Sequence, residues 1–442
     1  MNRPTSSGST AAVTGPASSG PAPLSVARRR ELQQKFEQAW RWLQDSSTPW
    51  TEVHPLLLEC TVADPASALY ADALLLNLRR FDHNRKRLWL VRWPRQSQIV
   101  AAALRRDWLT VLRLGPDVLS DDPRHLPVLL ALIDAHHALG HRESAWRYAE
   151  EALRHAPHDA ELWRRCGRVQ ASRGNFSPAQ TCWQEVLRRR ATDPEATRML
   201  AALSPSEPFP PAPALVPSAP LSALARALQP DSTPPSASDE FSQELARIGR
   251  SLQRHGWDEA TALAGAAAAR SGQDLRWREV VEELQWLRAD AQLRLAERLV
   301  ACDDDPAWRR LVDELRDSQE RLAGELLAAR CRRYPEDPLL HARLASLLGH
   351  RGHWAEAARC WEMATRDPCR EAAVAAWVQL GETRQRLRQF PEALACYRRA
   401  LALDDGPGEP AAWLERARRR VAALEDRSEG ASTPRQNATD SP

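Results

Sequence analysis

Two arginines in the first half of the chain are spaced for anion binding. Arg164 and Arg168 stand four residues apart in a segment with helical periodicity, so their side chains share one face of a helix. Two guanidinium groups on one face can hold a single carboxylate or phosphate through paired hydrogen bonds. The pair indicates an anion-binding position, and a solvated arginine face is the alternative interpretation.

A second group of cations is interleaved with aromatic residues. Between residues 79 and 95 the chain has seven Arg or Lys side chains against one acidic residue, Asp82, with Phe81, Trp89 and Trp93 among them. Such a segment can meet phosphates while its rings stack on bases or enter a membrane interface. The other interpretation is a solvated charge run whose aromatic residues belong to the core. The candidate polyanion contacts are Arg79, Arg80, Arg85, Lys86, Arg87, Arg92 and Arg95.

Histidine and aspartate clusters suggest metal chemistry, but their spacing argues against it. His137 and His141 have the HxxxH spacing, yet the glutamate of an HExxH motif is missing and Gly140 is expected to end the helix between them. Residues 303–305 lack the alternating ligands and the glycine of a calcium loop, and with Pro306 they indicate a helix N-terminus. The sequence also has no phosphate-binding loop, nucleophile elbow, kinase motifs or dinucleotide fingerprint. We therefore expect a noncatalytic protein with no cofactor and no metal ion.

One short pattern recurs three times and points to the elements that must carry these side chains. In each copy an aromatic residue is followed three residues later by Ala, and then by one of the pairs Cys182-Trp183, Cys360-Trp361 and Cys396-Tyr397. The alanine recurs after 34 residues, from Ala145 to Ala179, and after 36 residues, from Ala357 to Ala393. Pattern and period resemble the tetratricopeptide repeat (TPR) family, whose unit is a helix–turn–helix. The resemblance implies an all-α, TPR-like solenoid in which stacked helix pairs form a binding surface.

Small residues of the repeat pattern are expected at helix crossings. Gly167, Gly381, Ala179 and Ala393 would let the first helix (A) and the second helix (B) of a unit approach each other, while large rings fill the gap to the next unit. The repeated cysteines are expected to be reduced packing residues at a buried position. The aromatic residues expected in the core are Trp163, Trp183, Trp377 and Tyr397.

The repeats fall into two predicted arms. Ten prolines lie between residues 205 and 235, and because proline lacks an N–H donor and fixes φ, this segment is expected to be an extended linker. Apolar residues that step by three and four indicate a long antiparallel helical hairpin over residues 275–334. The expected organisation is a disordered tail (1–27), an N-terminal TPR-like array (28–202), a Pro-rich linker (203–239), a C-terminal array with the hairpin and a capping helix (240–425), and a second disordered tail (426–442).

Composition restricts the class of protein. The 442 residues are 43% apolar and carry a net charge of only +3, so overall charge does not indicate a polyanion partner. There are eight cysteines without a CxxC motif, no secretory apolar segment near the start, and no run of about 18 apolar residues. The plan of the chain also resembles a group of uncharacterised bacterial TPR proteins. We expect a cytoplasmic protein.

The resemblance implies a function in protein–protein interaction. In TPR proteins the A helices line a concave groove, and one chaperone-binding subfamily holds a C-terminal carboxylate there with Lys and Asn side chains. This chain departs from that clamp, because only Arg164 and Arg168 supply cations at those positions and the Asn is missing. We expect a scaffold that binds other proteins, with binding of nucleic acid or an anionic membrane by residues 79–95 as the alternative. The groove residues expected to select a partner are Asp134, His137, Arg164, Arg168, Glu382 and Arg386.

Overall fold

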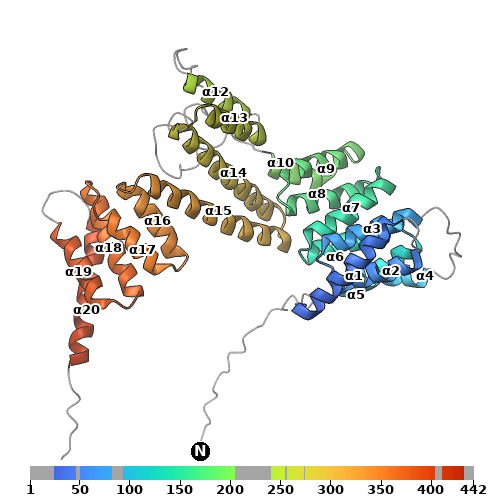
Figure 1. The fold of residues 1–442 in the computed structure, drawn as a ribbon, viewed down its shortest axis with the longest axis horizontal. Helices are drawn as coiled ribbons and strands as arrows, with labels where there is room; N and C mark the ends of the chain where they lie inside the picture. The colour runs from blue at the N-terminus through green and yellow to red at the C-terminus, as the bar shows by residue number, and fades with distance from the viewer. Residues whose placement is uncertain are drawn as a thin grey trace, which may run out of the picture. The chain divides into compact units, whose positions relative to one another are not determined.

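The chain folds as helices throughout the part that the structure describes. The computed structural model describes residues 24–45, 50–81, 93–204, 240–253, 256–272, 274–403 and 411–432. These residues form nineteen α-helices and no strand, as expected for an all-α solenoid (Figure 1). The prolines of the predicted linker and most of both predicted tails lie outside the described residues.

Two compact units make up the molecule. Unit 1 comprises Met1–Ser206 and Leu295–Val312, and unit 2 comprises Glu207–Arg294 and Asp313–Pro442. The two longest internal helices, α14 (Leu275–Cys302) and α15 (Pro306–Arg333), therefore place their joining turn in unit 1 and the rest of their length in unit 2. The sequence-based division put this turn in the C-terminal arm, so the two divisions differ at residues 295–312.

Unit 1 is a run of helices, most of which pack against their neighbours along the chain. Aspartates begin its later helices: Asp159 accepts the N–H of Leu162 at 2.7 Å, and Asp193 accepts the N–H of Ala196 at 2.9 Å. The helices are α1 (Val26–Gln44), α2 (Trp50–Ala63), α3 (Ala68–Phe81), α4 (Trp93–Leu104), α5 (Trp108–Asp121), α6 (Leu126–Ala138), α7 (Arg142–His155), α8 (Ala160–Ser172), α9 (Phe176–Arg189) and α10 (Pro194–Leu203).

Unit 2 begins with a separate helix pair, continues through the long hairpin and ends in two repeats and a final helix. The antiparallel arrangement of α14 and α15 follows from their contacts: Tyr334 donates to Glu279 at 2.8 Å, whereas Gln319, much earlier on α15, donates to Asp290 at 3.2 Å. This confirms the predicted hairpin. The other helices of unit 2 are α12 (Glu240–Gln253), α13 (Trp257–Arg270), α16 (Pro338–His350), α17 (Trp354–Ala364), α18 (Arg370–Arg386), α19 (Phe390–Ala402) and α20 (Ala411–Ser432).

Four helix pairs match the strongest repeats of the sequence: α6 with α7, α8 with α9, α16 with α17, and α18 with α19. In each pair the first helix is an A helix and the second a B helix, and the two lie side by side in Figure 1. Residues with positive φ connect A to B, namely Gly140, Gly174 and Gly352 in three pairs and Arg388 in the fourth. Such a turn favours glycine because a Cβ is strained there.

The predicted helix crossings are confirmed. A Cβ added at Gly167 would lie 2.7 Å from the Trp183 ring, and one at Gly381 would lie 2.6 Å from the Tyr397 ring. Both rings are fully buried, so the glycines are what allows A and B to approach this closely. Trp163 and Trp377, also expected in the core, are only partly buried, although both pack against buried core residues.

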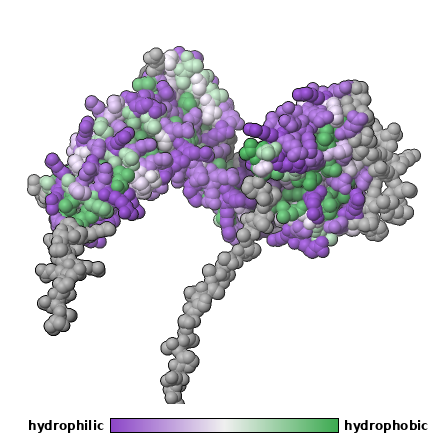
Figure 2. Space-filling model, turned by 60° about the horizontal axis from the view of Figure 1, so that its bottom comes forward, coloured by the Kyte–Doolittle hydropathy of each residue, from purple (hydrophilic) through white to green (hydrophobic). Residues whose placement is uncertain are grey.

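Hydrophilic side chains cover most of the visible face of each unit, and apolar side chains form smaller patches between them (Figure 2). Over the described residues, none of the helices is long and apolar enough to span a bilayer.

Candidate protein-binding surfaces

The two arginines predicted to grip an anion do converge on a carboxylate, and it belongs to the chain itself. On α8, Arg164 Nε lies 2.9 Å from Glu195 Oε2, and Arg168 donates from Nε to Glu195 Oε1 at 2.8 Å. Arg164 also pairs with Glu161 and with the buried carboxylate of Asp193. The pair therefore ties α8 to the start of α10.

The other two predicted groove residues of unit 1 are also engaged. Asp134 on α6 accepts a hydrogen bond from Arg165 Nε at 2.8 Å. His137, one turn later, faces the turn between α14 and α15: its Nε2 lies 3.5 Å from Asp305 Oδ2, and its ring meets the edge of Trp308 at 6.0 Å between centroids.

Further contacts fix that turn against α6, α8 and the end of α10. Arg168 Nη2 lies 3.6 Å from Asp303 Oδ2. Arg310 donates to the carbonyl of Ala138, the last residue of α6, at 2.9 Å, and Arg298 donates to the carbonyl of Ser204, just past α10, at 3.4 Å. Cations suit these positions because the last carbonyls of a helix have no partner within it.

Asp305 is ionised over the whole physiological pH range. Burial by itself would raise the pKa of Asp305, but the hydrogen bond with His137, the N–H of Ala307 and the nearby Arg168 guanidinium together lower it to about 2. The Ala307 N–H donates to Asp305 Oδ1 at 2.8 Å, so the same carboxylate begins α15 and faces α6.

In unit 2 both predicted groove residues contact side chains of neighbouring helices. Glu382 on α18 accepts two hydrogen bonds from Arg416 of α20, at 2.6 and 2.8 Å, and also lies 3.7 Å from Arg420. Arg386 is exposed and its guanidinium carbon lies 5.7 Å from the centroid of the Trp354 ring. The structure does not bring Glu382 and Arg386 together into one site.

The three histidines near the end of α6 and the start of α7 have different surroundings. Burial lowers the pKa of His136 to about 3, and its ring stacks on Tyr148 at 5.1 Å, so it is a neutral core residue. His137 faces Asp305, whereas His141 precedes α7. Among the described residues no three His, Cys, Asp or Glu side chains gather as a metal site would require.

Only part of the basic segment can be located. Arg85, Lys86, Arg87 and Arg92 lie outside the described residues. The described members each contact unit 1 itself: Arg79 donates to Glu151 at 2.7 Å, Arg80 to the carbonyl of Leu43, and Arg95 to Asp117 at 3.2 Å.

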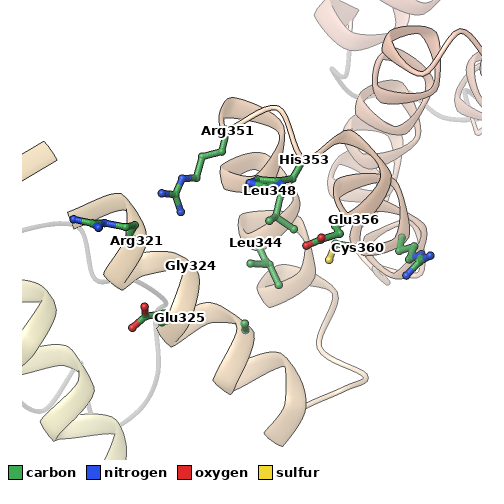
Figure 3. A pocket seen from close by; sticks show the side chains of 11 residues that line it. Arg321, Gly324, Glu325, Leu344, Leu348, Arg351, His353, Glu356 and Cys360 are labelled. Carbon is green, nitrogen blue, oxygen red and sulfur yellow. The ribbon is translucent and has the colours of Figure 1, made fainter. Parts of the chain in front are cut away.

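Two grooves on the B-helix side of unit 2 were not predicted. Groove 1, of about 440 Å³, lies where α15, α16 and α17 meet. Figure 3 shows Leu344 and Leu348 of α16 between the two flanking helices, with Arg351 reaching out beyond them. The floor is apolar and includes Gly324, Ala328 and Cys360, while the rim carries Arg321, Glu325, Arg351, His353, Glu356 and Arg359.

Groove 2 is the same feature one repeat later. It measures about 420 Å³ between α17, α18 and α19. Leu380 and Cys396 in groove 2 stand at the repeat positions of Leu344 and Cys360 in groove 1, and Glu392 stands at that of Glu356. The remaining lining residues are Glu362, Thr365, Arg366, Trp377, Arg384, Ala395 and Arg399.

The charge balance around the grooves leaves cations uncompensated. Arg384 holds both carboxylates of groove 2, Glu362 at 2.7 Å and Glu392 at 3.0 Å. No described carboxylate pairs with the other five guanidiniums that line the two grooves, which are those of Arg321, Arg351, Arg359, Arg366 and Arg399. Burial raises the pKa of both groove thiols, Cys360 and Cys396, so they are neutral lining groups rather than nucleophiles.

Two segments match a known repeat family. Residues 126–169, which cover α6, α7 and most of α8, match one tetratricopeptide repeat model, and residues 374–407, which cover most of α18 and all of α19, match another. A search of curated proteins finds no match to the chain.

The chain is also similar, at low sequence identity, to solved structures that include the following three. A tetratricopeptide repeat protein from Parabacteroides merdae ATCC 43184 is 11% identical over 90% of this chain and 99% of its own, with a TM-score of 0.20. Yeast Tom70 is 12% identical over 78% of this chain and 97% of its own, with a TM-score of 0.23. A chain of the APC/C hetero-tetramer Cut9-Hcn1 is 11% identical over 91% of this chain and 89% of its own, with a TM-score of 0.23.

TM-scores of 0.20 and 0.23 are too low to support any conclusion about how the helices of this chain are arranged. The repeat matches do bear on its identity. The match over 374–407 includes the crossing glycine Gly381 and its facing ring Tyr397, and the match over 126–169 covers the pair α6 with α7 and reaches Gly167 of the next pair. One matched pair lies in unit 1 and the other in unit 2. The chain is a tetratricopeptide repeat protein.

Proposed function

We propose that the chain is a noncatalytic scaffold that binds other proteins, and that grooves 1 and 2 of unit 2 receive a partner segment carrying both apolar and acidic side chains. Stacked helical repeats present extended surfaces of the kind that hold peptides or helices. The observation that carries the proposal is the set of five guanidiniums without a described carboxylate partner around two apolar floors.

The chemistry of the grooves favours such a ligand over a small molecule or a substrate. Each groove is open and lies where three helices meet, and its neutral thiol offers no nucleophile. An apolar side chain can displace water from the partly exposed Leu348 in groove 1 or Trp377 in groove 2, while carboxylates reach the rim. Charge-assisted hydrogen bonds to arginine are about twice as strong as neutral ones and orient a carboxylate.

The repeat relation between the grooves suggests how a longer segment would bind. Both grooves involve α17, which supplies Glu356, Arg359 and Cys360 to groove 1 and Glu362 to groove 2, where Arg366 follows just past its C-terminus. A segment lying along α17 would meet two equivalent apolar floors in turn, so its affinity would be the combined result of two modest contacts.

The alternative expectation, polyanion binding by residues 79–95, draws no support from the described residues. Arg79, Arg80 and Arg95 are each engaged with partners in unit 1. A basic surface that binds phosphates would need its cations to face solvent without such partners.

A displayed library of random peptides tests the proposal. We expect the selected peptides to combine Asp or Glu with apolar residues, and their affinity to fall as salt rises. Arg351→Glu combined with Arg359→Glu and Arg399→Glu should lower the affinity by about tenfold or more, since losing one charge-assisted hydrogen bond costs about 1.5–3 kcal/mol.

A control makes one charge reversal of the same kind outside the grooves. Arg419→Glu alters an exposed arginine in the middle of α20 whose one hydrogen bond to a described residue is to the Glu415 carbonyl of its own helix. It should leave the affinity unchanged. The proposal fails if the selected peptides bind the groove variant as well as they bind the wild type, or if they contain no excess of acidic residues.

A further inference from the structure

The A helices of unit 1 hold a segment that is distant in the sequence. The turn between α14 and α15 lies against α6, α8 and the end of α10, although Arg310 and the Ala138 carbonyl that it contacts are 172 residues apart. α6 and α8 are successive A helices and α10 follows the pair of α8 with α9, and A helices form the face that repeat arrays use for binding. The turn therefore occupies the position of a ligand.

Each contact of the turn matches a chemical feature of that face. Two carboxylates approach basic side chains: Asp303 lies 3.6 Å from Arg168, and Asp305 lies 3.5 Å from His137. Two guanidiniums approach helix C-termini, Arg310 at α6 and Arg298 at α10. Charge complementarity is thus present in both directions.

An aromatic residue anchors the centre of this contact. Trp308 is fully buried, and the edge of its ring meets His137, whose side chain is 11% exposed. Buried aromatic residues surrounded by charged pairs are typical of the centre of a recognition surface. Asp304, between the two contacting carboxylates, instead pairs locally with Arg309 and is 69% exposed.

The polar contacts are loose enough to be exchanged. At 3.5 and 3.6 Å, the two acidic contacts are longer than hydrogen bonds of good geometry. Ion pairs of this kind between partly exposed groups contribute about 0–1 kcal/mol. A competing segment with the same groups would offer equivalents of these two acidic contacts and of the Arg310 hydrogen bond.

We infer that the A-helix face of unit 1 recognises an acidic turn that starts a helix bearing tryptophan in its first turn, and that the α14–α15 turn is its resident ligand. A partner protein that presents such a segment competes with residues 303–310 for the face. This inference concerns a different surface from grooves 1 and 2 and does not rest on them.

The competition can be measured with a probe taken from the chain. The probe is a fluorescently labelled synthetic peptide reproducing residues 299–313, with serine in place of the cysteine. An intramolecular ligand acts at an effective concentration of about millimolar. The wild-type protein should therefore bind the peptide weakly, because its own turn occupies the face.

Weakening the resident turn should expose the face. In Asp303→Asn/Asp305→Asn both contacting carboxylates lose their charge, while the amide at position 305 can still begin α15. We expect this variant to bind the peptide at least about tenfold more tightly than the wild type does. Adding Arg168→Gln should reduce that gain, since the peptide then lacks its own basic partner. Hydrogen exchange of residues 299–312 should speed up in the double variant.

Asp304→Asn is the matched control, because it removes one charge from the same turn at a residue that pairs with Arg309 of α15 rather than with α6 or α8. It should leave both peptide affinity and hydrogen exchange as in the wild type. The inference is overturned if the double variant releases the turn but binds the peptide no better than the wild type does, because the freed face would then have no affinity for a separate copy of the turn. It is also overturned if hydrogen-exchange protection of residues 299–312 does not change in the double variant. The same holds if Asp304→Asn changes peptide affinity and hydrogen exchange as much as the double variant does.

Discussion

Replacing Gly381 with alanine should destabilise the protein although it improves helix propensity. Gly381 lies within α18, where a Cβ would stand 2.6 Å from Cε1 and 2.8 Å from Cζ of Tyr397. That ring cannot move aside easily, because it is fully buried and its hydroxyl donates to Gln385 Oε1 at 2.9 Å. The added methyl group must therefore push α18 and α19 apart.

Two opposing effects set the magnitude. Alanine is favoured over glycine in a helix interior by about 1 kcal/mol. Overpacking a tight core costs about 1–3 kcal/mol. The net effect of Gly381→Ala is expected to be a destabilisation of up to about 2 kcal/mol, and stacking will pass part of the displacement to the neighbouring helices.

Gly265 provides the matched control within the same unit. It lies inside α13, and a Cβ there would meet nothing within 4 Å. Gly265→Ala should therefore stabilise the protein by about 1 kcal/mol through propensity alone. Urea denaturation followed by circular dichroism compares the two variants, and their midpoints should move in opposite directions.

The effect of the contact between the new Cβ and the Tyr397 ring can be isolated in a variant that lacks this ring. In Tyr397→Leu the planar ring is absent, so Gly381→Ala should there become neutral or stabilising, which is a non-additive result for two residues in contact. The reasoning is refuted if Gly381→Ala stabilises the wild type as much as Gly265→Ala does. It is equally refuted if its cost is the same with and without the Tyr397 ring.

Three further predictions follow from burial and charge. Ala179→Leu and Ala393→Leu, at fully buried crossings, should each lower stability by about 1–3 kcal/mol in urea denaturation, whereas Ala268→Leu at a half-buried site should cost much less. Because the folded pKa of Asp305 is depressed to about 2, its contribution to stability is present above the unfolded value near 4 and is lost as pH falls between the two. The urea midpoints of wild type and Asp305→Asn should therefore differ at pH 6 and converge near pH 2. Alkylation with iodoacetamide should modify the exposed Cys369 first and Cys166 last, since Cys166 is fully buried and burial raises the pKa of its thiol well above the ordinary value, and mass spectrometry of peptides reads the order.

The helix pairs were predictable because their constraint is local and repeated. A crossing that allows no Cβ leaves Gly167 and Gly381 at the same point of two repeats, and the facing ring recurs at a fixed distance along the chain. The long hairpin was predictable for a similar reason, since its apolar residues step by three and four over many turns. Each of these patterns lies within one repeat or one helix.

The occupant of the A-helix face was not predictable, because nothing local connects it to its site. The sequence indicates correctly that residues 303–306 begin a helix, yet the contact between Arg310 and the end of α6 spans 172 residues. Glu195 likewise looks like an ordinary first-turn acid of α10, and only the fold brings it to Arg164 and Arg168. Charged residues show their pairing only when the partner is in place.

Grooves 1 and 2 escaped sequence analysis for a different reason. Arg351, Arg359 and Arg399 look like the solvated side of amphipathic helices, and their significance depends on which neighbouring arginines are already paired. A signal was present in the repeat itself, since Leu344 with Cys360 recurs one unit later as Leu380 with Cys396. Comparing B helices as well as A helices would have pointed to the grooves.

The A-helix positions of the two units differ in how firmly they are covered. In unit 2, Glu382 binds Arg416 through two hydrogen bonds of 2.6 and 2.8 Å, the fork geometry in which an arginine–carboxylate pair is strongest. In unit 1 the corresponding acidic contacts are single and lie at 3.5 and 3.6 Å. Displacing α20 from α18 therefore requires breaking a bidentate pair, whereas displacing the α14–α15 turn exchanges loose pairs for equivalent ones offered by a partner. The A-helix face of unit 1 is the exchangeable one, and in unit 2 the uncompensated charge of the grooves leaves the B-helix side as the surface open to an acidic ligand.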